Sequence, residues 1–506
     1  MKITRIRTAY KIAGIFIAMW AVVSCKKNET PPAQLTVGNI TDTIPEGGGT
    51  VALKFTTNAA WHVDTAGLKW LHLSQTSGNG GNVSINLTAA ANSSGMSRSL
   101  LLNLVSTNGQ SRRITVWQNA WIYPSYNTSP KAPDATGMGS TAVQLNANIK
   151  LGWNIWNTMD APGWETGWGQ PKITQHLIDL VKSTGMNAIR LPCTWSNHII
   201  DKKTWKIDPL WLARVKEVVQ YCINDNMYVM LNTHHETYLD CTVTGALQDT
   251  VNARHKAVWQ QIATTMRDFD EHLMFASANE PNGTDAPTTN TLMRYHQSFI
   301  DAVRSTGGKN TYRTLIIQAP STSIDLATQY LSPGNVYKYA QLPVDPTPKK
   351  MILEIHYYAP PNFAILGADA SWGKEWYFWG AGFHTTNPLF LDRNSTTSTE
   401  ESLVNSEFHS LKANFVDKGI PVIMGEYDAA IHADKLVGYK ADSLLSVNSR
   451  MHFFRYLTQQ AKANGVAPFL WGGGIINRPA KDGIATGPEV ISDQRALDSL
   501  KRGAGL

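Results

Sequence analysis

The spacing of apolar residues changes along the chain, and the first regular pattern is that of a β domain. From about residue 35 to 120 apolar and polar positions alternate with a period of two, as in strands with one buried face. Clusters of Gly, Asn and Ser separate the apolar runs. The clearest runs are Val51–Phe55, Val83–Leu87, Leu100–Val105 and Ile114–Trp117. Residues 35–120 are therefore predicted to form a small all-β, immunoglobulin-like sandwich.

From residue 147 onward, short apolar runs alternate with longer stretches of helical period, which is typical of βα units around a parallel sheet. Helical patterns include Trp211–Asn224, Val258–Asp268, Ser406–Lys418 and Met451–Asn464. The predicted strands are Ile149–Ile155, Ala188–Leu191, Val229–Asn232, Met274–Ala278, Leu315–Gln318, Met351–Ile355, Val422–Met424 and Ala467–Leu470. Eight repeats favour an α/β fold, a (β/α)₈ TIM barrel over residues 141–506. The alternative is an open doubly wound sheet, but no Gly-rich phosphate loop follows the first strand.

The N-terminus has the pattern of an export signal. Residues 1–11 are basic, and the apolar run 13–23 is too short to span a bilayer. The following Val22-Val23-Ser24-Cys25 resembles a bacterial lipobox, which implies cleavage before Cys25 and a lipid on its sulfur. We expect a lipoprotein signal peptide at 1–24, a polar tether at 25–34 and a lipid-anchored protein of the cell envelope, exposed at the outer-membrane surface. The alternative is ordinary secretion with an incidental cysteine.

The composition limits the classes of partner that the protein is expected to bind. The formal net charge is +6, but four basic residues lie in the first 24, so the mature chain carries about +2 and gives no reason to expect nucleic acid. Residues 121–140, rich in Pro, Ser, Thr and Gly, are predicted to be an interdomain linker. The four cysteines are too few for a disulfide framework, although a Cys193–Cys222 bridge stays open. We expect a monomer.

Ionisable and aromatic residues follow six of the eight predicted strands. In a (β/α)₈ barrel the C-terminal strand ends form the active face, so these residues are expected to gather there. They are Arg190 after the second strand, His234 and His235 after the third, Asn279 and Glu280 after the fourth, His356 and Tyr358 after the sixth, Glu426 after the seventh and Trp471 after the eighth.

Two of these residues, Glu280 and Glu426, are lone carboxylates expected on opposite sides of the barrel mouth. Glycoside cleavage needs such a pair, one to protonate the leaving oxygen and one to meet the reacting carbon. A zinc site built on His234 and His235 is disfavoured, because adjacent residues of a strand point to opposite faces. No metal and no other cofactor is predicted.

The ordered set of strand-end residues resembles glycoside hydrolase family 5. The segments Gly152-Trp-Asn-Ile-Trp-Asn157-Thr-Met-Asp160-Ala and Glu165-Thr-Gly-Trp168-Gly resemble signatures of its subfamily 4, which holds mostly endo-β-1,4-glucanases, including xyloglucanases. The β domain resembles BACON modules. That second resemblance rests on Trp61, Trp70-Leu71, Ser77-Gly78, Asn92, Arg98 and Gln118. The module would serve either as a carbohydrate binder or as a spacer, and we favour the spacer.

The resemblance implies a role for each site residue. Glu280 matches the general acid/base, which must keep its proton, and His356 lies where it could tune the pKa of that carboxyl group. Glu426 matches the nucleophile. Arg190 and Tyr358 would hold Glu426 ionised and oriented. The remaining matches are sugar contacts or supports: His234, His235, Asn279, Asn157 and, as a stacking floor, Trp471. Arg190 could alternatively be a structural salt bridge, and Trp471 plain core.

Two residues depart from the family pattern. Trp156 replaces a small glycine, and Ala276 stands where an acid is common. Both leave the substrate preference open. The tryptophans of the first loop, Trp153, Trp156, Trp164 and Trp168, could build sugar subsites or simply pack.

The sequence thus predicts an endo-acting, retaining β-1,4-glucanase that cleaves a plant cell-wall β-glucan polysaccharide, with xyloglucan among the candidates. The carboxyl groups of Glu280 and Glu426 should then lie about 5–5.5 Å apart. The alternatives are a β-mannanase and a catalytically dead, carbohydrate-binding surface lipoprotein.

Overall fold

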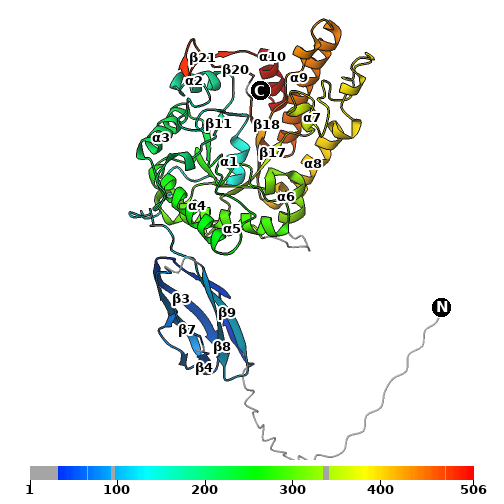
Figure 1. Ribbon diagram of the computed structural model, residues 1–506. Helices are drawn as coiled ribbons and strands as arrows, with labels where there is room; N and C mark the ends of the chain where they lie inside the picture. Colours follow the sequence, from blue (N-terminus) through cyan, green and yellow to red (C-terminus); the bar gives the residue numbers. More distant parts are fainter. Residues whose placement is uncertain (1–31, 65–66, 93–96, 334–340, 473) are drawn as a thin grey trace, which may run out of the picture. The chain divides into compact units, whose positions relative to one another are not determined.

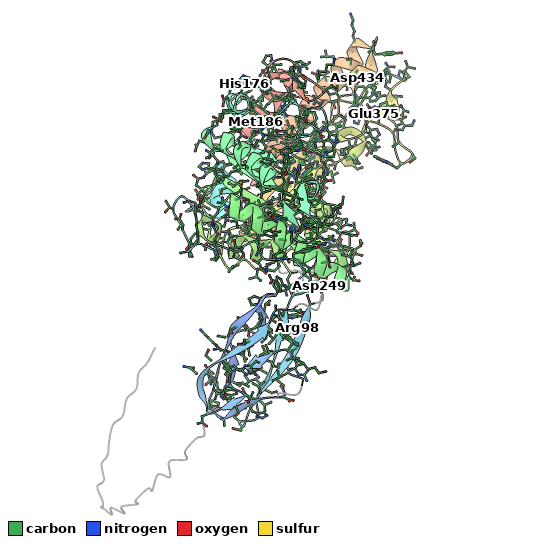
Figure 2. The ribbon with its side chains drawn as sticks, turned by 60° about the vertical axis from the view of Figure 1, so that its left-hand side comes forward. Arg98, His176, Met186, Asp249, Glu375 and Asp434 are labelled. Carbon is green, nitrogen blue, oxygen red and sulfur yellow. The ribbon has the colours of Figure 1, made fainter. Side chains whose placement is uncertain are left out.

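The computed structural model describes residues 32–506, except 65–66, 93–96, 334–340 and 473. The predicted signal peptide, Cys25 and most of the tether lie outside the described residues. The chain divides into two compact units (Figure 1, Figure 2). One holds most of a β-sandwich, and the other holds the barrel together with the sandwich segments 43–49 and 89–99.

The sandwich is built from two antiparallel sheets, as the period-two pattern predicts. One sheet has the order β1-β3-β7-β5 and the other β2-β9-β8-β4-β6. Alternate residues of the long strands are buried between the sheets, for example Leu53 and Phe55, and Phe55 meets the ring of Trp61 edge-on at 4.9 Å. The strands are β1 Leu35–Val37, β2 Thr41–Ile44, β3 Gly48–Thr57, β4 Trp61–Val63, β5 His72–Leu73, β6 Ser77–Gly78, β7 Gly81–Ala90, β8 Arg98–Ser106 and β9 Ser111–Gln118.

The larger unit is a closed parallel barrel of eight strands, which confirms the (β/α)₈ prediction. Closure comes from β10, which pairs with both β11 and β19, so the open-sheet alternative is wrong. The first strand is shorter than predicted. It begins three residues later than expected, at Gly152, and ends one residue earlier, at Asn154. The strands are β10 Gly152–Asn154, β11 Ala188–Leu191, β14 Tyr228–Asn232, β15 Leu273–Ala276, β16 Leu315–Gln318, β17 Met351–Tyr357, β18 Val422–Tyr427 and β19 Val466–Leu470.

Helices follow the barrel strands along the chain (Figure 1). Some of them begin with a side-chain cap, such as Thr174 before α2 and Asp285 before α5, which satisfies a free backbone N–H group. The helices are α2 Gln175–Ser183, α3 Pro209–Asn224, α4 Gly245–Thr265, α5 Ala286–Ser305, α6 Ile324–Leu331, α7 Pro361–Ala364, α8 Glu401–Asn414, α9 Lys440–Ala463 and α10 Gln494–Ala504. Three small two-stranded sheets lie in the loops: β12 Ile199–Asp201 with β13 Lys206–Ile207, β20 Ile476–Asn477 with β23 Val490–Ile491, and β21 Ala480–Lys481 with β22 Ile484–Ala485.

A helix that the strand pattern did not predict, α1 Ala142–Asn148, precedes the first barrel strand. Its Ala142 and Leu145 cluster with barrel residues such as Met230, Met274 and Ile352, all fully or almost fully buried. Helix α1 lies at the N-terminal ends of the strands, because Asn146 donates to the Gly465 carbonyl directly before β19. It leaves the C-terminal strand ends, with their polar residues, free for a site.

The segment 121–140 packs on the barrel rather than forming the free linker that its composition predicts. Tyr126 donates its backbone N–H to Gln260 and its hydroxyl to the Thr204 carbonyl, at 2.8 and 2.9 Å. Met138 is buried. A composition rich in Pro, Ser, Thr and Gly predicts that a segment lacks helix and strand. It does not predict whether the segment packs against a neighbouring domain. The segment is therefore part of the barrel unit.

The three described cysteines, Cys193, Cys222 and Cys241, are free and buried, so the Cys193–Cys222 bridge left open by the sequence is absent. Among the described residues, no helix combines the length and the apolar character needed to cross a membrane.

Candidate active site

The six strand ends that carry ionisable or aromatic residues meet at one end of the barrel. Arg190 lies in β11, His356 in β17 and Glu426 in β18, and all three are buried. The others lie one to four residues beyond the ends of their strands: His234 and His235 after β14, Asn279 and Glu280 after β15, Tyr358 after β17, and Trp471 after β19. Contacts between neighbouring members join them into one site.

Glu426 is held by two donors. Arg190 Nη1 donates to its Oε1 at 2.7 Å, and the Tyr358 hydroxyl donates to its Oε2 at 2.9 Å. Burial raises the pKa of Tyr358 well above its usual value, and the Glu426 charge adds to the shift, so the phenol keeps its proton. The arginine and the phenol therefore fix the orientation of the carboxylate, as a nucleophile needs.

Glu280 is half-exposed and has one close partner. Nδ1 of His356 lies 2.8 Å from its Oε1. Burial alone would lower the pKa of His356, but the charges of Glu426, Glu280 and Glu354 raise it to about 9. The histidine is thus an imidazolium at neutral pH. Its hydrogen bond lowers the pKa of Glu280. His356 is thus placed to tune that pKa, and the direction of its effect is downward.

The two carboxylates are close together. Glu280, His356 and Glu426 each place a ligating atom within 4.8 Å of the others, so one oxygen of Glu280 lies within that distance of one of Glu426. Inverting glycosidases need a wider separation, about 6.5–9.5 Å, to admit a water molecule. The spacing is that of a retaining enzyme, in which the second carboxylate attacks the sugar itself.

His234 lies beside the carboxylate pair and against Trp471. The rings of His234 and Trp471 are stacked, 5.7 Å apart and 6° from parallel. Burial, followed by the neighbouring charge of Arg190, lowers the pKa of His234 well below its usual value, so its imidazole is neutral. A neutral, buried imidazole beside an aromatic face suits a sugar hydroxyl better than an anion.

The aromatic surface continues outward from Trp471. The ring of His235 meets that of His234 edge-on at 4.5 Å, and the ring of Trp168 meets that of His235 edge-on at 5.7 Å. Trp168 is 45% exposed. We call Trp471, His234, His235 and Trp168 the aromatic row. It runs from the catalytic centre to the open surface.

The geometric reason given against a zinc site does not hold. His234 and His235 lie beyond the end of β14, where strand alternation no longer applies, and their ligating atoms lie within 4.8 Å of each other and of an Asp160 oxygen. Asp160, however, already accepts the backbone N–H groups of Asn157 and Thr158, at 3.3 and 2.7 Å. Its contacts explain it as the anchor of the first loop, in which Asn157 has a positive φ of 53°.

The first-loop tryptophans divide between packing and exposure. Trp153 is fully buried and donates to the Gly472 carbonyl at 3.2 Å, and Trp156 packs against the core. Trp164 and Trp168 are each 45% exposed. The large residue at position 156 is partly buried and packs against the core, whereas the outer pair exposes more of its surface.

Sequence reasoning missed three buried polar residues of the centre. Asn154 accepts from Arg190 Nη1 at 3.0 Å, and Asn279, which was predicted, accepts from Nη2 at 2.6 Å. Glu354 and Gln318 lie on the inner face of the barrel and contact each other at 2.5 Å. Glu354 carried a signal that was available: an acid inside an otherwise apolar strand, two residues before a site histidine.

Comparison with known proteins decides the family. The family model described as cellulase, glycosyl hydrolase family 5, matches residues 153–474. A xyloglucan-specific endo-β-1,4-glucanase of Bacteroides ovatus is 30% identical over 83% of this chain and 82% of its own length. Endoglucanase A of Paenibacillus barcinonensis is 31% identical over 74% of this chain and 93% of its own. The chain belongs to glycosyl hydrolase family 5.

Solved structures agree with this family 5 assignment. The GH5 xyloglucanase of Bacteroides ovatus, in complex with a XXXG heptasaccharide, matches with a TM-score of 0.67 and 27% identity, over 94% of this chain and all of that one. A GH5 xyloglucan-specific β-1,4-glucanase from a ruminal metagenomic library matches with a TM-score of 0.62 and 34% identity, over 72% of this chain and 96% of that one. A model described as a viral BACON domain matches residues 30–120.

As a family 5 member, the chain is an O-glycoside hydrolase with a retaining mechanism, which fits the close carboxylates of Glu280 and Glu426.

Proposed function

We propose that this family 5 enzyme is an endo-acting β-1,4-glucanase whose preferred substrate is xyloglucan, cleaved by double displacement. Glu426 attacks the anomeric carbon while Glu280 protonates the leaving oxygen, and Glu280 then activates water to release the sugar. The observation that carries the proposal is the contact network of the two carboxylates. Each has its own donor, and His356 lies between them.

The aromatic row supports binding within a polysaccharide chain. Flat aromatic faces suit sugar rings, and the row extends from Trp471 at the centre to the exposed Trp168. The preference for xyloglucan rests on the relatives, since similar proteins over most of the chain are named for that polysaccharide. Two intact, partnered carboxylates argue against the catalytically dead alternative.

The test is reducing-sugar release from xyloglucan, mixed-linkage glucan, carboxymethylcellulose, mannan and xylan, with Glu426→Gln as the inactive control. We expect the highest kcat/KM on xyloglucan. Viscosity should fall early relative to sugar release, because internal cuts shorten chains quickly. Preference for mannan would support the β-mannanase alternative. Absence of hydrolysis on every substrate would support the dead binding protein.

We also propose that the protein is anchored to the outer membrane through Cys25 and faces outward. The lipobox-like Val22-Val23-Ser24-Cys25 and the polar residues after it support this proposal. In the native host, labelled fatty acid should enter the wild type and not Cys25→Ser, and only the wild type should sediment with membranes. Protease treatment of intact cells tests the outward orientation. A Cys25→Ser variant that still carries label and sediments would contradict the anchor.

A further inference from the structure

Glu354 occupies the interior of the barrel beneath the two catalytic carboxylates, and its side chain is fully buried. Its Oε1 lies 3.0 Å from Nε of Arg190 and 3.2 Å from Nε2 of His356. The arginine N–H is not aimed at that oxygen, so this contact is an ion pair rather than a directed hydrogen bond. Gln318 donates to Oε2 at 2.5 Å. One carboxylate thus contacts side chains from β11, β16 and β17.

The barrel leaves room for this carboxylate at one position of the neighbouring strand. A Cβ at Gly425 in β18 would lie only 2.0 Å from Oε1 of Glu354, so residue 425 must lack a side chain. Gly425 directly precedes Glu426. The close approach therefore places Glu354 against the backbone that carries the predicted nucleophile.

Glu354 also contacts two cationic groups that lie close together. Nη2 of Arg190 lies 3.4 Å from Nε2 of His356, an unfavourable distance for two positive charges out of water. The arginine donates to Glu426 and the histidine to Glu280, at 2.7 and 2.8 Å. Both cations therefore reach outward to a catalytic carboxylate and lie against Glu354 on the inner side.

A third connection runs through Gln318. Its Nε2 donates to Glu354, and its Oε1 accepts the backbone N–H of Ala278 at 2.7 Å. Ala278 is two residues before Glu280, so the orientation of Glu354 is linked to the end of the strand that carries the predicted acid/base. A residue with a stability role alone has no need of separate links to both catalytic carboxylates.

We propose that Glu354 is a positioning residue that holds Arg190 and His356 for catalysis, and that it supplies from β17 the interior carboxylate that Ala276 lacks on β15. Ala276 is fully buried among apolar barrel residues and stands where the family pattern has an acid. The inference deepens the proposed function and rests on it for its kinetic test.

The first test is Glu354→Gln, which keeps the shape and removes the charge. We expect kcat to fall about 10- to 100-fold with a smaller change in KM, because the catalytic groups lose their alignment. The basic limb of kcat/KM should move to lower pH by about one unit, because an imidazolium loses a contacting anion. The charged and titratable groups around that imidazole are Glu280, Glu354, Glu426, Arg190 and His234.

Nitrogen NMR of labelled imidazoles follows the titration of His356 without any substrate, with His356→Asn to assign the signal. The matched control is Asp345→Asn, which removes the charge of a similarly buried pair with Arg304, at 2.5 Å, outside the site. The control should lose stability and keep the wild-type pH profile. If Glu354→Gln also keeps both the profile and the His356 titration, the proposal is wrong. If the wild type hydrolyses no β-1,4-glucan, the proposed function fails instead, while the NMR result still stands.

The second test moves the acid back to β15. Glu354→Ala should be about as impaired as Glu354→Gln, and Glu354→Ala combined with Ala276→Glu should recover activity about fivefold or more, since cooperating groups are strongly non-additive. Circular dichroism and thermal unfolding establish that each variant is folded. A folded double variant no more active than Glu354→Ala would overturn the assignment of positions 276 and 354 as alternative sites for one carboxylate.

Discussion

At the scale of single residues, the main question is whether Glu280 or His356 carries the proton that the two groups share. His356 has a pKa of about 9, and its hydrogen bond lowers the pKa of Glu280, so the proton lies on the imidazole in the unliganded enzyme. The proposed acid needs that proton on its own carboxyl group. In this structure the proton is on Nδ1 of His356, which lies 2.8 Å from Oε1 of Glu280. We therefore expect the pair to titrate as a unit, and activity to fall at high pH as the pair loses its proton.

The roles of the two carboxylates can be separated with an aryl β-cello-oligosaccharide that has an acidic phenol. Glu426→Gln should abolish turnover of both this substrate and polysaccharide, since no glycosyl-enzyme forms. Glu280→Gln should spare the first step on the activated substrate and accumulate intermediate, because water then lacks a base. Burst kinetics and mass spectrometry of the trapped enzyme measure this.

Azide adds a stereochemical check on the same two positions. Azide needs no base, so it should restore turnover of Glu280→Ala with a β-glycosyl azide as product, and of Glu426→Ala with the inverted α product. Glu217→Gln, a change to a half-exposed carboxylate outside the site, should behave as wild type. The opposite pairing of products would mean that the two roles are reversed. Unchanged hydrolysis in both variants would place the active site elsewhere.

At the scale of elements, the barrel was predictable because each buried strand is a short apolar run between helical patterns. The element bounds were less accurate. Helix α4 begins at Gly245, well before the apolar pattern at Val258, because its first turns carry polar residues. Helix α1 was not predicted, because no helical pattern was recognised between residue 141 and the first strand. Periodicity finds the buried face of an element, and element ends depend on caps and on neighbours that the pattern does not contain.

The same limit applies to the site. The strand-end rule pointed to loop residues such as Glu280 and His234, which the structure places near Arg190 and His356, because topology alone brings C-terminal strand ends together. It missed Glu354 and Gln318, which point inward one layer below, since an inward polar residue looks like part of the strand. The positive charge on His356 could not be predicted from the sequence either. It depends on three carboxylates from different strands, and only their distances reveal it.

At the scale of the whole molecule, each unit has its own buried core. The sandwich buries residues such as Ile85, Leu104 and Ile114 between its two sheets, and the barrel has a separate, much larger apolar core. All residues assigned to catalysis belong to the barrel unit. Segment 121–140 also packs on the barrel, so the catalytic unit begins near residue 117 and not at 141.

Deletion of residues 26–120 should therefore leave catalysis on soluble substrates nearly intact. The variant keeps Cys25 for anchoring and the 121–140 segment for the barrel. It removes the sandwich, whose apolar core lies between its own two sheets. We expect kcat/KM on a soluble xyloglucan oligosaccharide within about twofold of the wild type, since independent domains contribute separately. A second deletion, of residues 26–140, is the informative comparison. It should lower thermal stability, because Tyr126 and Met138 lose their barrel contacts.

Activity on intact cells separates the two roles left open for the sandwich. If the module is a spacer, the 26–120 deletion should slow hydrolysis of large, insoluble wall material by anchored enzyme and not by enzyme released from the membrane, since only the anchored form needs reach. If the module binds carbohydrate, both forms should lose activity on insoluble material to a similar extent. A large loss of turnover on the soluble oligosaccharide would contradict both, and would show that the sandwich is part of the catalytic unit.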